Sequence, residues 1–167
     1  WSELQSKQDA GYQHFKRKVG RPGLFSQELE TLKELQSKLG TGDKLRLDAN
    51  RALTSRAQVE ALAAFDIEFV EEPMAFDDYV QWSETPVPLA LDESLRDHSD
   101  LTRAAHLKPR HWVLKPALIG GPLELFHEVE RAEKAGAQPV LSHLFDGPVA
   151  RAAYLECARL LPGVAHG

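Results

Sequence analysis

The stretch Lys44-Leu45-Arg46-Leu47-Asp48-Ala49-Asn50 is a short, largely apolar run that ends on an acidic residue. Similar runs recur along the chain, each bounded by Gly, Pro, Asp or Asn and followed by a charged or polar residue. Their length and boundaries are typical of buried parallel strands. Strands are predicted at residues 12–19, 44–47, 67–70, 87–91, 111–114 and 138–141.

The segments between these runs have the spacing of helices. In residues 26–39, Leu29, Leu32, Leu35 and Leu39 recur near helical spacing, and Gly40 is a suitable stop. Further helices are predicted at residues 56–65, 123–135 and 148–161. Repeated strand–helix units predict an α/β fold in which helices cover a parallel sheet.

Such a sheet is either open or closed into a barrel. The segment Val19-Gly20-Arg21-Pro22-Gly23 after the first run lacks the G-x-G-x-x-G pattern of dinucleotide-binding open sheets. In a closed barrel, by contrast, reactive groups come from the C-terminal ends of several strands. The chemistry of the strand ends favours the barrel.

Charged residues of two kinds follow the predicted strands. The ends carry, in order, Lys16 and Lys18, Asp48, Glu71, Asp92, and Lys115. They recur roughly every 20 to 30 residues, the length of a βα unit, so they are expected at one level of the barrel mouth. Because strand side chains alternate, Lys16 and Lys18 are expected on one face and Arg17 on the other.

These residue types suit proton abstraction next to a carboxylate. The three carboxylates Asp48, Glu71 and Asp92 form an all-oxygen ligand set that favours Mg²⁺, with Mn²⁺ as a substitute. Lys18 and Lys115 lie on either side of that set in strand order, where they would face each other across a substrate. A base must be neutral at working pH, and cationic neighbours and desolvation lower the pKa of a lysine.

Each of these residues, taken alone, is more often found in an ordinary structural role than in a catalytic one. Paired lysines occur at solvated strand ends, Asp48 and Asn50 are of types that favour turns, and Asp92 is a possible helix N-cap. His143 is assigned no catalytic role. The prediction therefore depends on the joint occurrence of these residues in this order.

The motifs Lys16-x-Lys18, Asp48-x-Asn50, Glu71-Glu72-Pro73, Asp92-Glu93-Ser94 and Lys115-Pro116 together resemble the muconate-lactonizing branch of the enolase superfamily. Within that branch the segments 45–52, 91–96 and 113–116 are most similar to the o-succinylbenzoate synthases. The resemblance implies a (β/α)7β barrel like that of triosephosphate isomerase. It implies Mg²⁺ ligation by Asp48, Glu71 and Asp92, and a lysine base, a mechanism already established for the superfamily.

The resemblance also implies residue roles. Lys18 would be the base, Lys115 would stabilise the enediolate, and Lys16 would assist the carboxylate and tune Lys18. The substrate would be a small carboxylate, 2-succinyl-6-hydroxy-2,4-cyclohexadiene-1-carboxylate, dehydrated in menaquinone biosynthesis. Further substrate contacts are assigned to Asn50, Arg46, Gly120, Gly121 and Ser142.

Two alternatives stay open. A dipeptide epimerase or N-acylamino acid racemase shares the lysines and acids, although Lys115-Pro116 favours the synthase. The other is a catalytically inactive barrel fragment with a structural role, whose unclosed sheet would leave strand edges unpaired.

Length and composition restrict the rest. Residues 1–167 are interpreted as one partial barrel domain, from about the second strand to the last, which would lie near residues 164–167. A capping domain and the first strand, which the family carries, are not seen. The net charge of −5, the scattered Lys and Arg, and the lack of a long apolar stretch argue against nucleic-acid or membrane partners. Cys157, the only cysteine, excludes an internal disulfide and fits a cytoplasmic protein.

Overall fold

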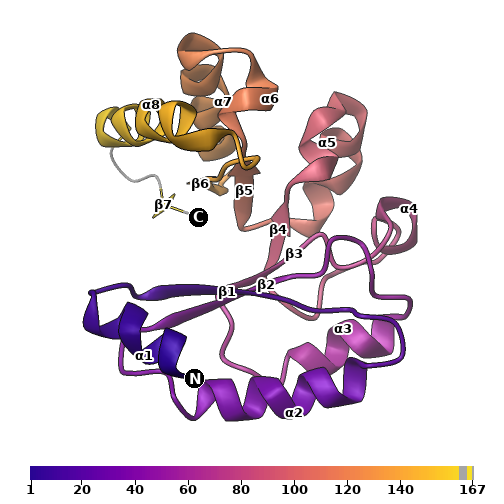
Figure 1. Ribbon diagram of the computed structural model, residues 1–167. Coiled ribbons are helices and arrows are strands. Elements are labelled where there is room, and N and C mark those ends of the chain that lie inside the picture. Colours follow the sequence, from indigo (N-terminus) through magenta and orange to yellow (C-terminus); the bar gives the residue numbers. More distant parts are fainter. Residues whose placement is uncertain (162–164, 167) are drawn as a thin grey trace. The chain divides into compact units, whose positions relative to one another are not determined.

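The computed structural model describes residues 1–161 and 165–166 (Figure 1). Residues 162–164 and 167, at the predicted last strand, lie outside the described residues, although Ala165–His166 form the short strand β7. The chain divides into two compact units. The first is Trp1–Tyr79 with Pro86–Pro88, and the second is Val80–Thr85 with the chain from Leu89 onward. The prediction that the whole chain forms one barrel domain stays a prediction.

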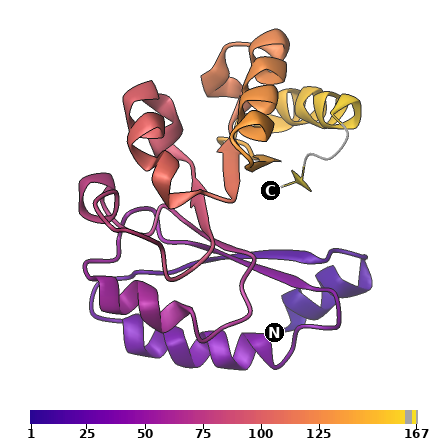
Figure 2. The ribbon, with the colours of Figure 1, turned by 180° about the vertical axis from the view of Figure 1, so that it is seen from behind.

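The first unit is a parallel β-α-β-α-β array. Its elements are α1 (Ser2–Asp9), β1 (His14–Lys18), α2 (Phe25–Gln36), β2 (Lys44–Asp48), α3 (Arg56–Leu62), β3 (Phe69–Glu71) and α4 (Phe76–Tyr79). In both views α2 and α3 lie on one side of the three strands (Figures 1 and 2). The parallel strands pair Lys18 with Asp48 and Asp48 with Glu71. Three predicted site residues therefore lie at one level of the sheet.

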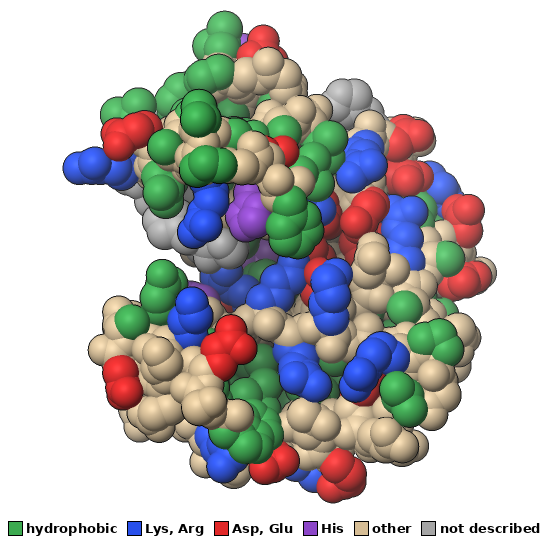
Figure 3. Space-filling view, in the orientation of Figure 1, with side chains coloured by type: hydrophobic (Ala, Val, Ile, Leu, Met, Phe, Trp, Pro, Cys, Tyr) green, Lys and Arg blue, Asp and Glu red, His purple; other side chains and the backbone are tan. Residues whose placement is uncertain are grey.

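Alternation along β2 explains how the same strand serves both core and site. Leu45 and Leu47 are buried among the apolar core, while Arg46 and Asp48 point to the opposite face. From α2, Leu32 and Leu35 contribute to the core of the unit. Figure 3 shows acidic and basic side chains interspersed on the visible face of the first unit, as the scattered charges of the sequence predict.

The second unit continues the alternation. Its elements are β4 (Leu89–Leu91), η1 (Glu93–Arg96), α5 (His98–Ala104), η2 (Ala105–Leu107), β5 (His111–Leu114), α6 (Pro116–Ile119), α7 (Pro122–Lys134), β6 (Gln138–Leu141), α8 (Gly147–Leu160) and β7. Neighbouring strands from β4 to β7 pair in parallel. A cluster around Trp112, Leu125 and Val129 packs α7 against β5 and β6. Pro122 begins α7 and Gly136, at φ 77°, follows it, and both ends of the helix lie one residue before the predicted ends.

The predicted α/β alternation is confirmed in both units, with element ends displaced by at most three residues. The helix α1 was not predicted. None of its residues is buried, and its sequence lacks the periodic apolar residues by which an amphipathic helix is recognised. The short elements α4, η1, α5, η2 and α6 follow strand ends and were not predicted either. Within the described residues, no helix is both long and apolar enough to cross a bilayer.

A buried carboxylate fixes the loop after β1. Glu28 is 1% exposed, and its side chain accepts hydrogen bonds from the backbone amides of Gly20 (2.8 Å) and Arg21 (3.2 Å) and from Arg21 Nε (3.0 Å). Gly20 has φ 93°, and a Cβ there would lie 2.9 Å from Ala52 Cβ, so only glycine fits. Burial alone would raise the pKa of the Glu28 carboxyl. The hydrogen bonds from the Gly20 amide and from the amide and side chain of Arg21, together with the positive charge of Arg21, hold its pKa below its usual value.

These contacts of Glu28 make the free energy of unfolding depend on pH in the acid range. A carboxyl whose pKa is lower in the folded state contributes stability above its unfolded pKa, here about 4.5, and loses it as the pH falls through the lower folded pKa. Glu28→Gln is therefore expected to lower the free energy of unfolding by about 2 kcal/mol at pH 7. It should also reduce the loss of stability below about pH 4.5. Urea titrations at pH 7, 5, 4 and 3 measure both effects.

Glu30→Gln, on an exposed side chain of the same helix, is the control and should follow the parent. Equal acid dependence in parent and Glu28→Gln would contradict the assignment.

Candidate active site

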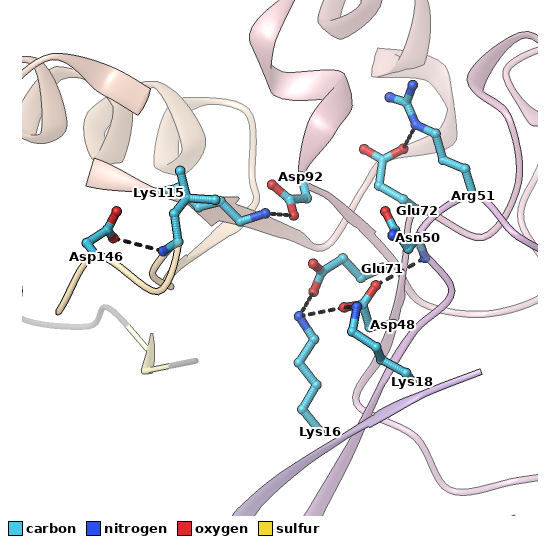
Figure 4. Close-up of polar contacts among 11 residues, drawn as sticks. Lys16, Lys18, Asp48, Asn50, Arg51, Glu71, Glu72, Asp92, Lys115 and Asp146 are labelled. Carbon is cyan, nitrogen blue, oxygen red and sulfur yellow. Dashed lines mark hydrogen bonds and ion pairs between the residues drawn. The ribbon is translucent and has the colours of Figure 1, made fainter. Parts of the chain in front are cut away.

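The charged ends of β1, β2 and β3 meet in the first unit. Lys16 Nζ lies 2.7 Å from Glu71 Oε2 and 3.1 Å from Asp48 Oδ2, and so bridges the two carboxylates (Figure 4). Lys18 Nζ lies 3.2 Å from the same Asp48 oxygen. The side chains of Asp48 and Glu71 are 10% and 3% exposed, whereas that of Lys18 is 73% exposed. The structure thus brings four predicted site residues together, with both acids buried and Lys18 open to solvent.

The attraction between the lysines and the two carboxylates outweighs burial in setting the pKa values of Lys16 and Asp48. Burial would lower the pKa of Lys16, but the negative charges of Glu71 and then Asp48, with their hydrogen bonds, raise its pKa above the usual value. Burial would likewise raise the pKa of Asp48, yet Lys16 and Lys18 hold it below its usual range. Both groups are therefore charged at neutral pH. The tuning of Lys18 by Lys16 stays a prediction.

The residues of this group fit a divalent cation. Asp48 and Glu71 present buried carboxylate oxygens side by side and already hold the ammonium group of Lys16 between them. The backbone amide of Asn50 donates to Asp48 Oδ1 at 3.1 Å and fixes the orientation of this carboxylate. Hard oxygen donors of this kind suit Mg²⁺. Neither unit alone, within the described residues, gathers three potential metal ligands. The three-carboxylate set that includes Asp92 stays a prediction.

In the second unit the remaining two predicted residues pair with each other. Lys115 Nζ contacts Asp92 Oδ2, and both side chains are largely buried, at 14% and 4% exposed (Figure 4). They follow β5 and β4, two paired parallel strands. Both line a cavity of about 290 Å³ with a mixed lining, made of the apolar Leu95, Val113, Leu114, Leu118 and Ile119 and the polar Arg96, Glu124, His127 and Glu128. The arrangement places an ammonium group beside a cavity large enough for part of a small organic acid.

The predicted substrate residues have varied surroundings. Arg46 is 2% exposed, donates from Nε to Glu68 at 2.6 Å and lies over the Phe69 ring, so these contacts hold its guanidinium in the fold. Asn50 adopts φ 44° and orients Asp48. Gly120 ends α6 at φ 115°, and Gly121 precedes α7. Ser142 follows β6, where its amide donates to the Leu114 carbonyl at 2.9 Å. Their substrate contacts stay predictions.

Sequence reasoning missed Glu28 and Glu72, two fully buried acids. Glu28 precedes Leu32 and Leu35 by four and seven residues, so helical spacing already placed it on the buried face of α2. Glu72 is 0% exposed and directly follows Glu71. Strand alternation turns it away from the site, and no pattern in the sequence indicates which donors it meets.

Comparisons with known proteins agree with this geometry. The profile of the family described as "Enolase C-terminal domain-like" matches residues 2–167. The chain is 31% identical over 162 residues to the N-succinylamino acid racemase of Thermus thermophilus, covering 93% of this chain and 42% of the relative. It is 34% identical over 170 residues to the o-succinylbenzoate synthase of Thermosynechococcus vestitus, covering 90% and 50%.

The solved structure of muconate lactonizing enzyme from Pseudomonas putida has the same fold, with a TM-score of 0.75 at 24% identity over 92% of this chain and 46% of that chain. The chain spans about half the length of the curated relatives it matches. The barrel architecture expected from the strand–helix pattern is therefore that of its structural neighbours, present here in part. The chain belongs to the enolase superfamily, as part of its C-terminal barrel domain.

Proposed function

We propose that the protein is a Mg²⁺-dependent o-succinylbenzoate synthase, which dehydrates 2-succinyl-6-hydroxy-2,4-cyclohexadiene-1-carboxylate. The observation that carries the proposal is the bridging of Asp48 and Glu71 by Lys16, with Lys18 beside them and open to solvent. The 34% identity to a synthase over most of the chain supports the choice of this reaction.

The chemistry is a β-elimination of water. Lys18 Nζ, in its neutral form, takes the proton from the carbon that bears the carboxylate. The ring carbon–oxygen bond then breaks, and the hydroxyl group leaves as water with a proton from the Lys18 ammonium. When bound, Mg²⁺ supplies Lewis-acid stabilisation of the charge that develops on the substrate carboxylate. Asp48, Glu71 and Asp92 would hold it.

The other residues orient the substrate and stabilise charge. Lys115 would stabilise the enediolate, because its ammonium group would favour the negative charge that builds up on the substrate. Lys16 keeps the carboxylate pair ordered through its two contacts. A capping domain elsewhere in the protein would close over the substrate and exclude water.

A racemase is the second candidate, because the chain is 31% identical to an N-succinylamino acid racemase over 93% of its length. Racemisation needs one base on each face of the reacting carbon, and Lys18 and Lys115 would supply both. A dipeptide epimerase would use the same pair. An inactive barrel fragment remains the alternative from a different class.

The test is aromatisation of the cyclohexadiene carboxylate, followed by ultraviolet absorbance with Mg²⁺ and then with EDTA. Because the chain spans about half of its relatives, the same assay is run on the whole protein. We expect aromatisation that EDTA abolishes. Racemisation of N-succinylamino acids or epimerisation of dipeptides without aromatisation would overturn the proposal in favour of the second candidate. No activity of either kind in the whole protein would favour the inactive fragment.

A further inference from the structure

The buried carboxylate of Glu72 ties together the ends of two strands. It is 0% exposed and accepts a hydrogen bond from Arg51 Nε at 3.2 Å (Figure 4). It accepts a second one from Tyr79 Oη at 3.3 Å. Arg51 follows β2, Glu72 follows β3, and Tyr79 ends α4. We call these three residues the Glu72 network. Burial of a carboxylate is costly unless donors and a positive charge compensate it, so the loss of these partners should disturb the structure around Glu72.

The network lies where the backbone is strained. Asn50, Arg51 and Glu72 have φ of 44°, 62° and 40°, in the left-handed region that side-chain-bearing residues rarely adopt. Such conformations persist only when surrounding contacts fix them, and they gather at functional sites. Here they come directly after Asp48 and Glu71, and the contacts that fix them include those of Glu72.

Backbone hydrogen bonds connect the network to the two acids. The Arg51 amide donates to the Glu72 carbonyl at 2.7 Å, and the Ala49 amide donates to the Glu71 carbonyl at 3.1 Å. The Asn50 amide donates to Asp48 Oδ1. The turn that the Glu72 network holds therefore supplies the donor that orients Asp48. The same bonds fix the spacing between Asp48 and Glu71.

We propose that Glu72 is a positioning residue, which holds Asp48 and Glu71 in the arrangement that binds a divalent cation. The inference rests on the proposed function, because it takes the two acids as metal ligands. Glu72 lies outside the ligand set and acts through the backbone at the two strand ends. Partners of this outer kind typically change metal affinity 10- to 100-fold when replaced.

The test measures Mn²⁺ affinity by electron paramagnetic resonance, with urea stability measured in parallel. Glu72→Gln, which keeps the size of the side chain, is expected to bind Mn²⁺ about 10-fold more weakly. Tyr79→Phe removes one donor and should weaken binding less, in the same direction. Glu28→Gln is the matched control, because Glu28 is equally buried in the same unit but is bonded to the loop after β1. It should lose stability and keep the parental affinity.

Two further measurements separate this inference from the proposed metal site. Asp48→Asn removes a predicted ligand directly. If it lowers Mn²⁺ affinity and Glu72→Gln does not, the positioning role is overturned and the metal site stands. Amide hydrogen exchange gives a readout without metal: Glu72→Gln should lose protection at the Arg51 and Ala49 amides, and Glu28→Gln should not.

If the parent protein binds no Mn²⁺, the proposed metal site is overturned together with any metal-directed role of Glu72. Unchanged exchange at both amides in Glu72→Gln would show that Glu72 does not hold the strand ends. Either result overturns the inference. Weaker Mn²⁺ binding with faster exchange at these amides, at nearly parental stability, would support it.

Discussion

Replacing Lys18 with alanine is expected to lower turnover about 1,000-fold while Mg²⁺ affinity changes little. A positioned general base contributes about 10²- to 10⁴-fold to a rate, and Lys18 is the proposed base. Its side chain is 73% exposed, with a contact to Asp48 at 3.2 Å, so its loss should leave the fold intact. The initial rate of aromatisation gives turnover, and calorimetric titration gives Mg²⁺ affinity.

Lys33→Ala is the control for Lys18→Ala, because Lys33 is a similarly exposed lysine on α2 whose contact is with Glu30. It should keep the parental rate. Near-parental activity in Lys18→Ala would remove Lys18 as the base. A joint loss of turnover and Mg²⁺ affinity would instead assign Lys18 a role in arranging Asp48.

The second large effect is expected from Asp92→Ala, which should weaken Mg²⁺ binding by at least about 100-fold. Replacing a residue that only supports a metal ligand typically weakens binding 10- to 100-fold, and loss of a ligand itself should cost at least as much. The variant removes one of three predicted carboxylate ligands. It also removes the acid that contacts Lys115, whose side chain is only 14% exposed. Loss of a buried ion-pair partner is costly, so some loss of stability should accompany the loss of affinity. Calorimetric titration with Mg²⁺ and urea unfolding measure the two effects.

Asp97→Ala provides the comparison in the same part of the chain. Asp97 caps α5 through a hydrogen bond from the Ser99 amide at 2.8 Å. Its replacement should cost about 1 kcal/mol of stability and leave Mg²⁺ affinity unchanged. Parental affinity in Asp92→Ala would exclude Asp92 from the ligand set and leave Asp48 and Glu71 as a two-carboxylate site.

Much of the first unit follows from local sequence patterns. The interval between Asp48 and Glu71 is one βα unit, so parallel pairing had to place them at one level, and the register confirms it. The alternation of Lys16 and Lys18 predicted that they share a face, and both contact Asp48. These features could be predicted because strand period and βα length act over short stretches of chain.

Other features needed the tertiary structure. The bridging of Asp48 and Glu71 by Lys16, which raises the pKa of this lysine, depends on three strands that come together only in the fold. The burial of Arg46 and its ion pair with Glu68 also form only in the fold, and its substrate contact stays a prediction.

The sequence by itself determined the α/β alternation, the order of the charged strand ends and the shared face of Lys16 and Lys18, because these depend on periodicity and on the spacing of residues along the chain. Only the tertiary structure decided which ion pairs form and that Glu72 meets Arg51 and Tyr79. Those contacts join residues 7 and 21 positions apart through turns with left-handed backbone, and no local pattern encodes where such turns direct their side chains.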